Sequence, residues 1–133
     1  MGNAIASKNF ELSLQELLWG FMEFASDAGE ESFPPYESWL WHDFLHTLKS
    51  DFSGKFPALA CIGRFDWNDT SPKCREFDIA MFGLRYQSFA KNPGGRVFLN
   101  VENRRDRNPL VKHMPDLAHA ALKLARKLPG FFE

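Results

Sequence analysis

ALACIGRFDWNDTSPKCREFDIAMFGLRYQSFAKNPGGRVFLNVEN, residues 58–103, contains three apolar segments separated by two turn-rich ones. The apolar segments are 58–67, 75–87 and 96–103, and Asn, Pro, Gly and Ser recur in the intervening residues 68–72 and 91–95. Short connections between consecutive strands favour antiparallel pairing. The sequence therefore predicts a three-stranded antiparallel β-meander whose middle strand is apolar on both faces.

Two helices are predicted before the meander. Ser13 and Glu16 form a capping-box pattern, and apolar residues then recur at helical spacing up to Gly29. A second helix is expected to open at the prolines 34–35 and to run to about Phe52. Both helices carry an apolar stripe that can pack on one face of the sheet.

A third helix is predicted after the meander. Pro115 suits the first helical position, and an apolar stripe continues to about Leu128. The chain end Phe131-Phe132 is expected to pack back onto the core. The predicted fold is a single α+β domain over residues 1–133 with the order ααβββα, in which residues 1–10 form a flexible tail.

The composition is that of an ordinary globular domain apart from its aromatic residues. Hydrophobic residues make up 44% of the chain and charged residues 25%, but there are 14 phenylalanines and 4 tryptophans. No apolar run approaches the ~20 residues that span a bilayer, and residues 1–10 lack the pattern of a signal peptide. We therefore expect a cytoplasmic protein in which Cys61 and Cys74 are reduced.

Charge is divided unevenly along the chain. Residues 1–53 hold two Lys and Arg against nine Asp and Glu, a net charge of 2 − 9 = −7. Residues 54–133 hold fourteen against eight, a net charge of 14 − 8 = +6. Such asymmetry indicates a basic face for nucleic acid, an acidic face for a basic partner, or attraction between the two halves of the chain itself.

A pair of histidines four residues apart resembles part of a zinc-protease motif. His42 and His46 would share one helical face, but Asp43 stands where the general-base glutamate would be expected. No clear third ligand follows. The pattern is more typical of a polar helix face, and we predict neither a metal site nor a cofactor.

A nuclease is a second alternative to be considered. Restriction-type nucleases share the order helix, three strands, helix, with an acid on the second strand and an acid-x-Lys on the third that bind Mg²⁺. Asp78 and Glu102 fall near those places. Arg104 replaces the lysine, however, and an arginine is too firmly protonated to manage a water proton. The sequence therefore favours a protein without catalytic residues.

A basic run surrounds the predicted third strand and the loop that follows it. It consists of Arg96, Arg104, Arg105, Arg107 and Lys112, followed by His113. Such a run can bind phosphates, so nucleic-acid binding through residues 96–112 is the first alternative function. Three acids interrupt the run, and this favours a solvated or protein-contacting loop.

Several short segments resemble the PsiB family of plasmid SOS-inhibition proteins. They are residues 51–57 (DFSGKFP), 64–65 (RF), 75–80 (REFDIA), 92–95 (NPGG) and 101–105 (VENRR), the last before an alanine-leucine helix. The resemblance covers roughly the last two-thirds of the chain, whereas the first hairpin turn is longer than that family's and the N-terminal helices do not match clearly. The resemblance implies a non-catalytic inhibitor that binds a recombinase.

The function predicted from these observations is non-catalytic binding of a protein partner. The chain would act as an inhibitor, immunity or regulatory protein that occludes its partner, and a DNA-processing protein such as a recombinase is a candidate partner. Excess aromatic residues, a sheet with two apolar faces and the charge asymmetry point this way. The predicted partner-binding residues are Trp39, Trp41, Phe82, Phe98, Arg104, Arg105 and Arg107.

Overall fold

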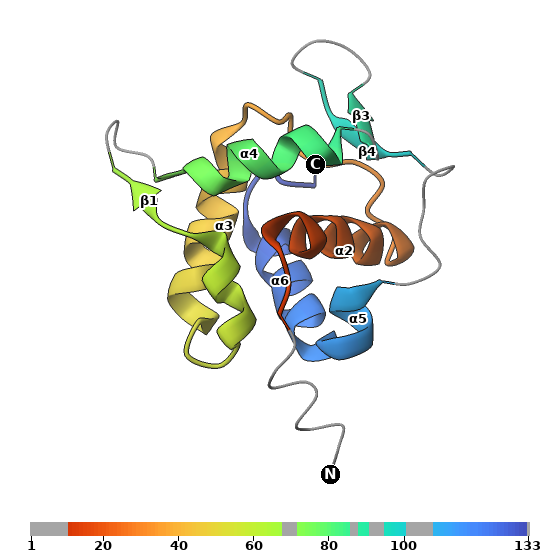
Figure 1. Cartoon of the computed structure of the whole chain (residues 1–133). Helices are drawn as coiled ribbons and strands as arrows, with labels where there is room; N and C mark the ends of the chain where they lie inside the picture. The colour runs from red at the N-terminus through yellow and green to blue at the C-terminus, as the bar shows by residue number, and fades with distance from the viewer. Residues whose placement is uncertain (1–10, 68–71, 86–87, 91–94, 101–107, 133) are drawn as a thin grey trace.

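Helix α2 (Leu14–Asp27) runs through the middle of the molecule, and the other helices are arranged around it (Figure 1). Helix α4 (Arg75–Leu84) packs on one side of α2, while α5 (Pro109–His113) and α6 (Pro115–Lys127) contact it on the other. The computed structural model describes residues 11–67, 72–85, 88–90, 95–100 and 108–132. Within them the fold is α+β, with helices and short antiparallel strand pairs.

The capping box predicted for the first helix is confirmed. The Ser13 hydroxyl accepts a hydrogen bond from the Glu16 amide at 3.1 Å, and the Glu16 carboxylate accepts one from the Ser13 amide at 2.9 Å. At the other end, Gly29 follows the helix with φ 108°, a left-handed conformation that glycine adopts without a steric penalty. Most of α2 is buried, because neighbours cover it on several sides.

The second helix begins later than predicted. Helix α3 (Trp39–Phe52) ends at the expected residue, but its N-cap is Ser38, whose hydroxyl accepts from the Leu40 amide at 3.1 Å. The prolines at 34–35 lie in the segment before it. There the chain is held away from helical geometry because Phe33 exchanges backbone hydrogen bonds with Val97.

The third predicted helix is confirmed as α6, with Pro115 at its first position. A short helix that the sequence reading did not include, α5, precedes it, and the Asn108 side chain caps it by accepting from the Val111 amide. The expected packing of the chain end is also confirmed, because Phe131 is fully buried.

The first predicted strand is wrong over most of its length. Residues from Pro57 to Ile62 form a 3₁₀ helix, η1 (Pro57–Ile62), and only β1 (Phe65–Asp66) is extended. Pro57 supplies a first helical position with a fixed φ. Gly63 then turns the chain with φ 84°, at a point where a Cβ atom would lie 2.4 Å from the Glu76 side chain.

The predicted middle strand is a helix. Residues Arg75–Leu84 form α4, and Phe77, Ala80 and Leu84 face the core. A short run that is apolar at almost every position fits a two-sided strand and a helical stripe equally well. Here the buried residues follow the helical period, and Ile79 is left on the outside.

Two strand pairs therefore stand in place of the three-stranded meander in the part of the chain that the structure describes. Strand β1 pairs with β2 (Lys73–Cys74), with Phe65 opposite Cys74. Strand β3 (Ser88–Ala90) pairs with β4 (Val97–Leu99). Residues 101–103 of the predicted third strand lie outside the described residues.

Aromatic rings form the centre of the core. The Trp41 indole stacks on Phe77 with ring centroids 5.5 Å apart and meets Phe131 edge-on at 5.2 Å. Phe44 joins the same cluster from the next turn of α3, in contact with Phe21 of α2 at 4.7 Å. Among the described residues, no helix is both long enough and apolar enough to cross a membrane.

Candidate functional site

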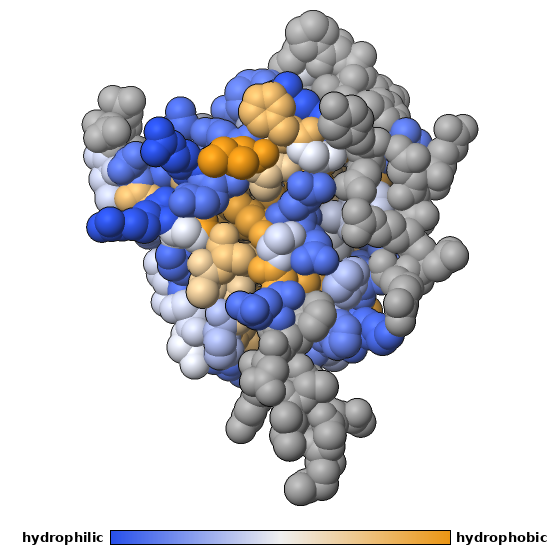
Figure 2. Space-filling view, viewed as in Figure 1, coloured by the Kyte–Doolittle hydropathy of each residue, from blue (hydrophilic) through white to orange (hydrophobic). Residues whose placement is uncertain are grey.

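The outer face of α4 carries the most exposed large apolar side chains of the described residues. Phe82 is 70% exposed and Ile79 is 63% exposed, although both belong to a well-formed helix. Figure 2 shows hydrophobic surface over α4 with hydrophilic residues beside it. Exposed apolar groups that gather on one face are typical of a contact surface.

Arg85 and Tyr36 extend this exposed face. The Arg85 guanidinium lies 5.6 Å from the centre of the Phe82 ring and 5.6 Å from that of Tyr36, so two rings contact one cation. The Tyr36 hydroxyl is hydrogen-bonded to Ser88, and burial raises the pKa of Tyr36. We call Tyr36, Ile79, Phe82 and Arg85 the α4 surface.

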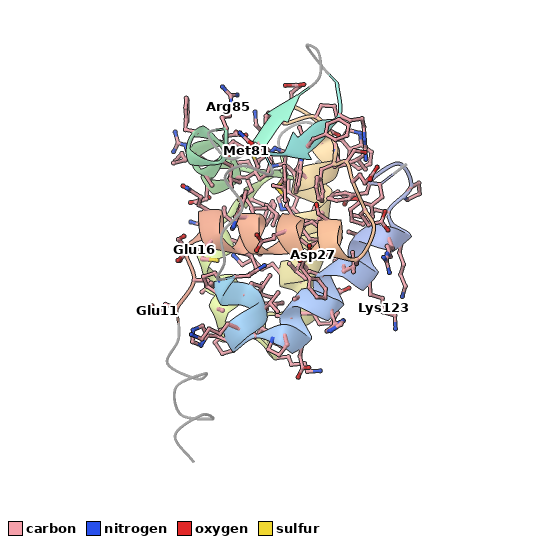
Figure 3. The ribbon with its side chains drawn as sticks, turned by 90° about the vertical axis from the view of Figure 1, so that its right-hand side faces the viewer. Glu11, Glu16, Asp27, Met81, Arg85 and Lys123 are labelled. Atoms are coloured by element: carbon pink, nitrogen blue, oxygen red, sulfur yellow. The ribbon has the colours of Figure 1, made fainter. Side chains whose placement is uncertain are left out.

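The inner side of α4 is anchored to the core. Met81 is 3% exposed, and Figure 3 shows it on the α2 side of the helix, with Arg85 farther out. A hydrogen bond of 2.9 Å from the backbone amide of Cys74 to Nδ1 of His42 ties the start of α4 to α3. The α4 surface is therefore presented by a helix that is fixed at its start and along its buried side.

His42 is a buried histidine with a structural partner at each nitrogen. Its Nδ1 accepts from Cys74, so its Nε2 carries the proton in the neutral ring, 3.8 Å from the Asp78 carboxylate. Burial lowers the pKa of His42, and the nearby Asp78 opposes this shift only in part. The neutral ring of His42 therefore links α3 to the start of α4 through a hydrogen bond.

Both cysteines are free, as expected, and neither is activated. The Cys74 thiol donates to the Ile62 carbonyl oxygen at 2.9 Å, and burial raises its pKa. Burial also raises the pKa of Cys61 to about 11. Because the thiolate is the reactive form, both thiols are poor nucleophiles at neutral pH.

The structure separates the two tryptophans that were predicted as partner contacts. Trp39 is 56% exposed at the start of α3. Trp41 is fully buried, and its Nε1 donates to the Pro34 carbonyl oxygen at 2.9 Å. Its assignment to a partner surface is therefore wrong, because a core indole cannot reach a partner. Phe98 is partly buried on β4, and Arg104, Arg105 and Arg107 lie outside the described residues.

The described residues that were considered for metal chemistry do not form a metal site. His42 uses Nδ1 within the fold, while His46 lies edge-on to two aromatic rings. Asp78 sits on a helix, so the strand position that the nuclease alternative requires is not met, and Glu102 lies outside the described residues. No group of three or more potential metal ligands occurs among the residues that were described.

Arg96, the first member of the basic run, is engaged inside the fold. Its guanidinium donates to the backbone oxygens of Ser32, Gly130 and Phe131 and to the Ser32 hydroxyl. It thereby joins the segment before α3 to the chain end. Lys112 is exposed on α5, and residues 101–107 of the run lie outside the described part of the chain.

Sequence reasoning named Phe82 but missed Ile79, Arg85 and Tyr36. The helical period would have found Ile79, because it is the residue left outside when Phe77, Ala80 and Leu84 form the buried stripe. The position of Tyr36 depends on tertiary contacts and has no local signal.

Comparison of the chain with known protein families, with curated proteins and with solved structures found no match.

Proposed function

We propose that the chain is a non-catalytic regulatory or inhibitory protein that binds a partner protein through the α4 surface. The observation that supports this most strongly is the pair Ile79 and Phe82, exposed side by side on a helix whose opposite face is locked into the core. Two large apolar side chains left in water do not stabilise the folded monomer. A partner that covers them removes their surface from water, which favours binding.

The composition of the α4 surface suits a protein interface. Aromatic residues and arginine are enriched at the centres of interfaces, and here Arg85 lies against the rings of Tyr36 and Phe82. Arg75 and Asp78 are exposed on the same helix, so charged groups border the apolar centre. An apolar centre with a charged rim combines affinity with orientation.

A DNA-processing protein such as a recombinase is the partner that the resemblance to the PsiB family implies. One of the segments that carry the resemblance, residues 75–80, forms the first half of α4 and includes Ile79. We therefore propose that such a partner is occluded by α4. Nucleic-acid binding through residues 96–112 and Mg²⁺-dependent hydrolysis remain predictions without a supporting arrangement in the described residues.

The test is capture of the partner from a lysate of the source cell on the immobilised protein. Four forms are compared: wild type, Ile79→Ser with Phe82→Ser, Phe82→Leu, and Trp67→Ser as an equally exposed control elsewhere on the surface. Each lysate is divided into nuclease-treated and untreated halves. Because all substituted side chains are exposed, the variants are expected to keep the wild-type unfolding transition.

A stoichiometric protein captured by wild type, Phe82→Leu and Trp67→Ser but lost with the double serine variant would support the proposal. Loss of one interface residue of this kind typically weakens binding by about 1–2 kcal/mol or more, so the double variant is expected to lose at least about tenfold in affinity. Equal capture by the double serine variant would refute the α4 surface as the binding site. Capture that disappears after nuclease treatment would instead indicate nucleic acid.

A further inference from the structure

A second surface feature lies away from the α4 surface, between the C-terminal half of α3 and the segment around β1. It is an open groove of about 400 Å³, in the ~300–1,000 Å³ range of small-molecule sites. One wall is a single face of α3, formed by His46, Lys49, Ser50 and Ser53, whose spacing places them together.

The other wall contains an exposed aromatic ring that contacts α3. Trp67 is 60% exposed, and its ring meets the imidazole of His46 edge-on, with centroids 4.5 Å apart. Phe65 contacts the same imidazole at 5.0 Å, so His46 lies edge-on to both rings. The exposed part of the Trp67 ring offers a surface on which a planar group can stack.

Two cations line the same groove. The Lys49 ammonium donates to the carbonyl oxygen of Gly63, which directs it toward the chain segment that carries Arg64. A neutral carbonyl does not neutralise the lysine charge, and Arg64 is exposed without an ion pair to any described residue. The described lining of the groove includes two serine hydroxyls and no carboxylate.

The C-terminus of α3 weakens anion binding in this groove, because helix C-termini carry partial negative charge. However, backbone carbonyl oxygens in the last turn of α3 already accept hydrogen bonds from amides of the chain. The Phe52 carbonyl oxygen accepts from the amides of both Lys55 and Phe56, and that of Lys49 accepts from Ser53. The two cations outweigh the remaining partial charge, since each carries a full unit.

We propose that this groove binds a nucleoside phosphate, with the base stacked on Trp67 and the phosphate held by Arg64 and Lys49. An aromatic platform beside basic side chains is the combination that binds single-stranded nucleic acid and nucleotides without base-specific contacts. The same base-plus-phosphate unit occurs in a free nucleotide and in a single strand. The site is independent of the protein-binding role assigned to α4.

The experiment measures binding of three probes to the full chain. A fluorescein-labelled oligodeoxythymidine is followed by polarisation, and AMP and adenosine are followed by saturation-transfer NMR. The variants are Trp67→Ala and Arg64→Gln. Their matched controls are Trp39→Ala, the exposed tryptophan at the other end of α3, and Lys127→Gln on α6. Thermal unfolding of every variant is recorded alongside.

The expected result is binding of AMP, of the strand or of both, weakened about tenfold or more by Trp67→Ala and unchanged in Trp39→Ala. Arg64→Gln should weaken the phosphate-bearing probes and reduce their salt dependence, while Lys127→Gln should not. AMP without the strand would identify a free nucleotide as the ligand, and the strand without AMP would identify nucleic acid.

Three results would overturn the proposal: no binding of AMP or strand at about 1 mM, adenosine bound as well as AMP, or binding unchanged in both groove variants. The last result would place any nucleotide site elsewhere on the chain. Because the groove variants leave Ile79 and Phe82 unchanged, the result of this experiment does not depend on the result of the partner-capture experiment.

Discussion

His42 shows how one buried side chain places the candidate surface. Its Nδ1 holds the Cys74 amide at 2.9 Å, at the residue that precedes α4. Protonation would convert this acceptor into a donor facing another donor, so the charged ring cannot keep the contact. Burial already lowers the pKa of His42 below its ordinary value.

Stability is therefore expected to fall on mild acidification. Between the lowered pKa of the folded state and the ordinary value of about 6.5, the unfolded chain binds more protons than the folded one. The free energy of unfolding should thus decrease as the pH falls through this window and level off below the folded pKa. Urea unfolding between about pH 7.5 and about pH 5 measures it.

The control is His42→Asn, whose side-chain oxygen can replace Nδ1 as the acceptor for Cys74 but does not titrate. The variant should lose part of the acid-induced decrease that the wild type shows. If the wild type and His42→Asn have parallel stability curves over this range, His42 is not the group responsible. A variant with Ala at this position would be less informative, because it also opens a cavity.

Residue-scale features were predictable where the partners are near in sequence. The Ser13 and Glu16 capping box spans three positions and could be read directly. The hydrogen bond between His42 and Cys74 joins residues 32 positions apart, and nothing in the local sequence distinguishes His42 from a histidine on a polar helix face. The burial of Trp41 rather than Trp39 likewise depends on contacts with residues far away in the sequence, so local sequence could not tell the two apart.

At the scale of elements, the helices with a clear polar face were predicted and the apolar segment was not. Helix α6 alternates apolar and charged residues at the helical period, so its bounds differ from the prediction by about one residue. Residues 75–84 have apolar side chains at Ile79 and Phe82 where a polar face would be expected. The feature that misled the prediction is thus the one that defines the α4 surface.

The contact between α2 and α5 depends on a glycine. A Cβ atom at Gly20 would lie 2.7 Å from the Asn108 side-chain oxygen and 2.7 Å from Leu110 Cβ. Leu110 is fully buried, so it has little freedom to move aside. Gly20 therefore allows α5 to approach α2, and Asn108 donates to the Gly20 carbonyl oxygen at 2.9 Å across this contact.

Gly20→Ala is expected to destabilise the fold by about 1–3 kcal/mol, because overpacking outweighs the better helix propensity of alanine. Gly54→Ala is the matched control, since a Cβ atom there would have open space and the residue has no positive φ. It should be neutral or stabilising by up to about 1 kcal/mol. Chemical denaturation of both variants makes the comparison, and equal stability of the two would contradict the close α2–α5 contact.

At the scale of the whole molecule, the C-terminal segment is joined to earlier parts of the chain. Arg126 of α6 pairs with Glu30 at 2.9 Å, linking the basic and acidic halves of the sequence. Arg96 donates to the Phe131 carbonyl oxygen at 2.6 Å. Part of the charge asymmetry along the chain is thus used inside the fold, which was one of the alternatives that the sequence left open.

The excess of phenylalanine is explained mainly by the core. Phe131 is fully buried against Phe21, Phe44 and Trp41, so the last turn of the chain closes an aromatic cluster built by α2 and α3. That the chain end packs back was predictable from two apolar residues after a helix stop. Which rings it meets was not, because their contacts connect residues far apart in the sequence.

Phe131→Ala should accordingly destabilise the whole domain by about 3–5 kcal/mol, the usual cost of removing a buried phenylalanine. Its neighbour Phe132 is only partly buried and packs against the edge of the same cluster, so Phe132→Ala should cost clearly less. Urea unfolding followed by tryptophan fluorescence measures both, since Trp41 lies in contact with Phe131. Because a domain of this size has only about 5–15 kcal/mol of stability, Phe131→Ala should also lower the thermal midpoint markedly. Similar losses in the two variants would mean that the chain end does not close the core through Phe131.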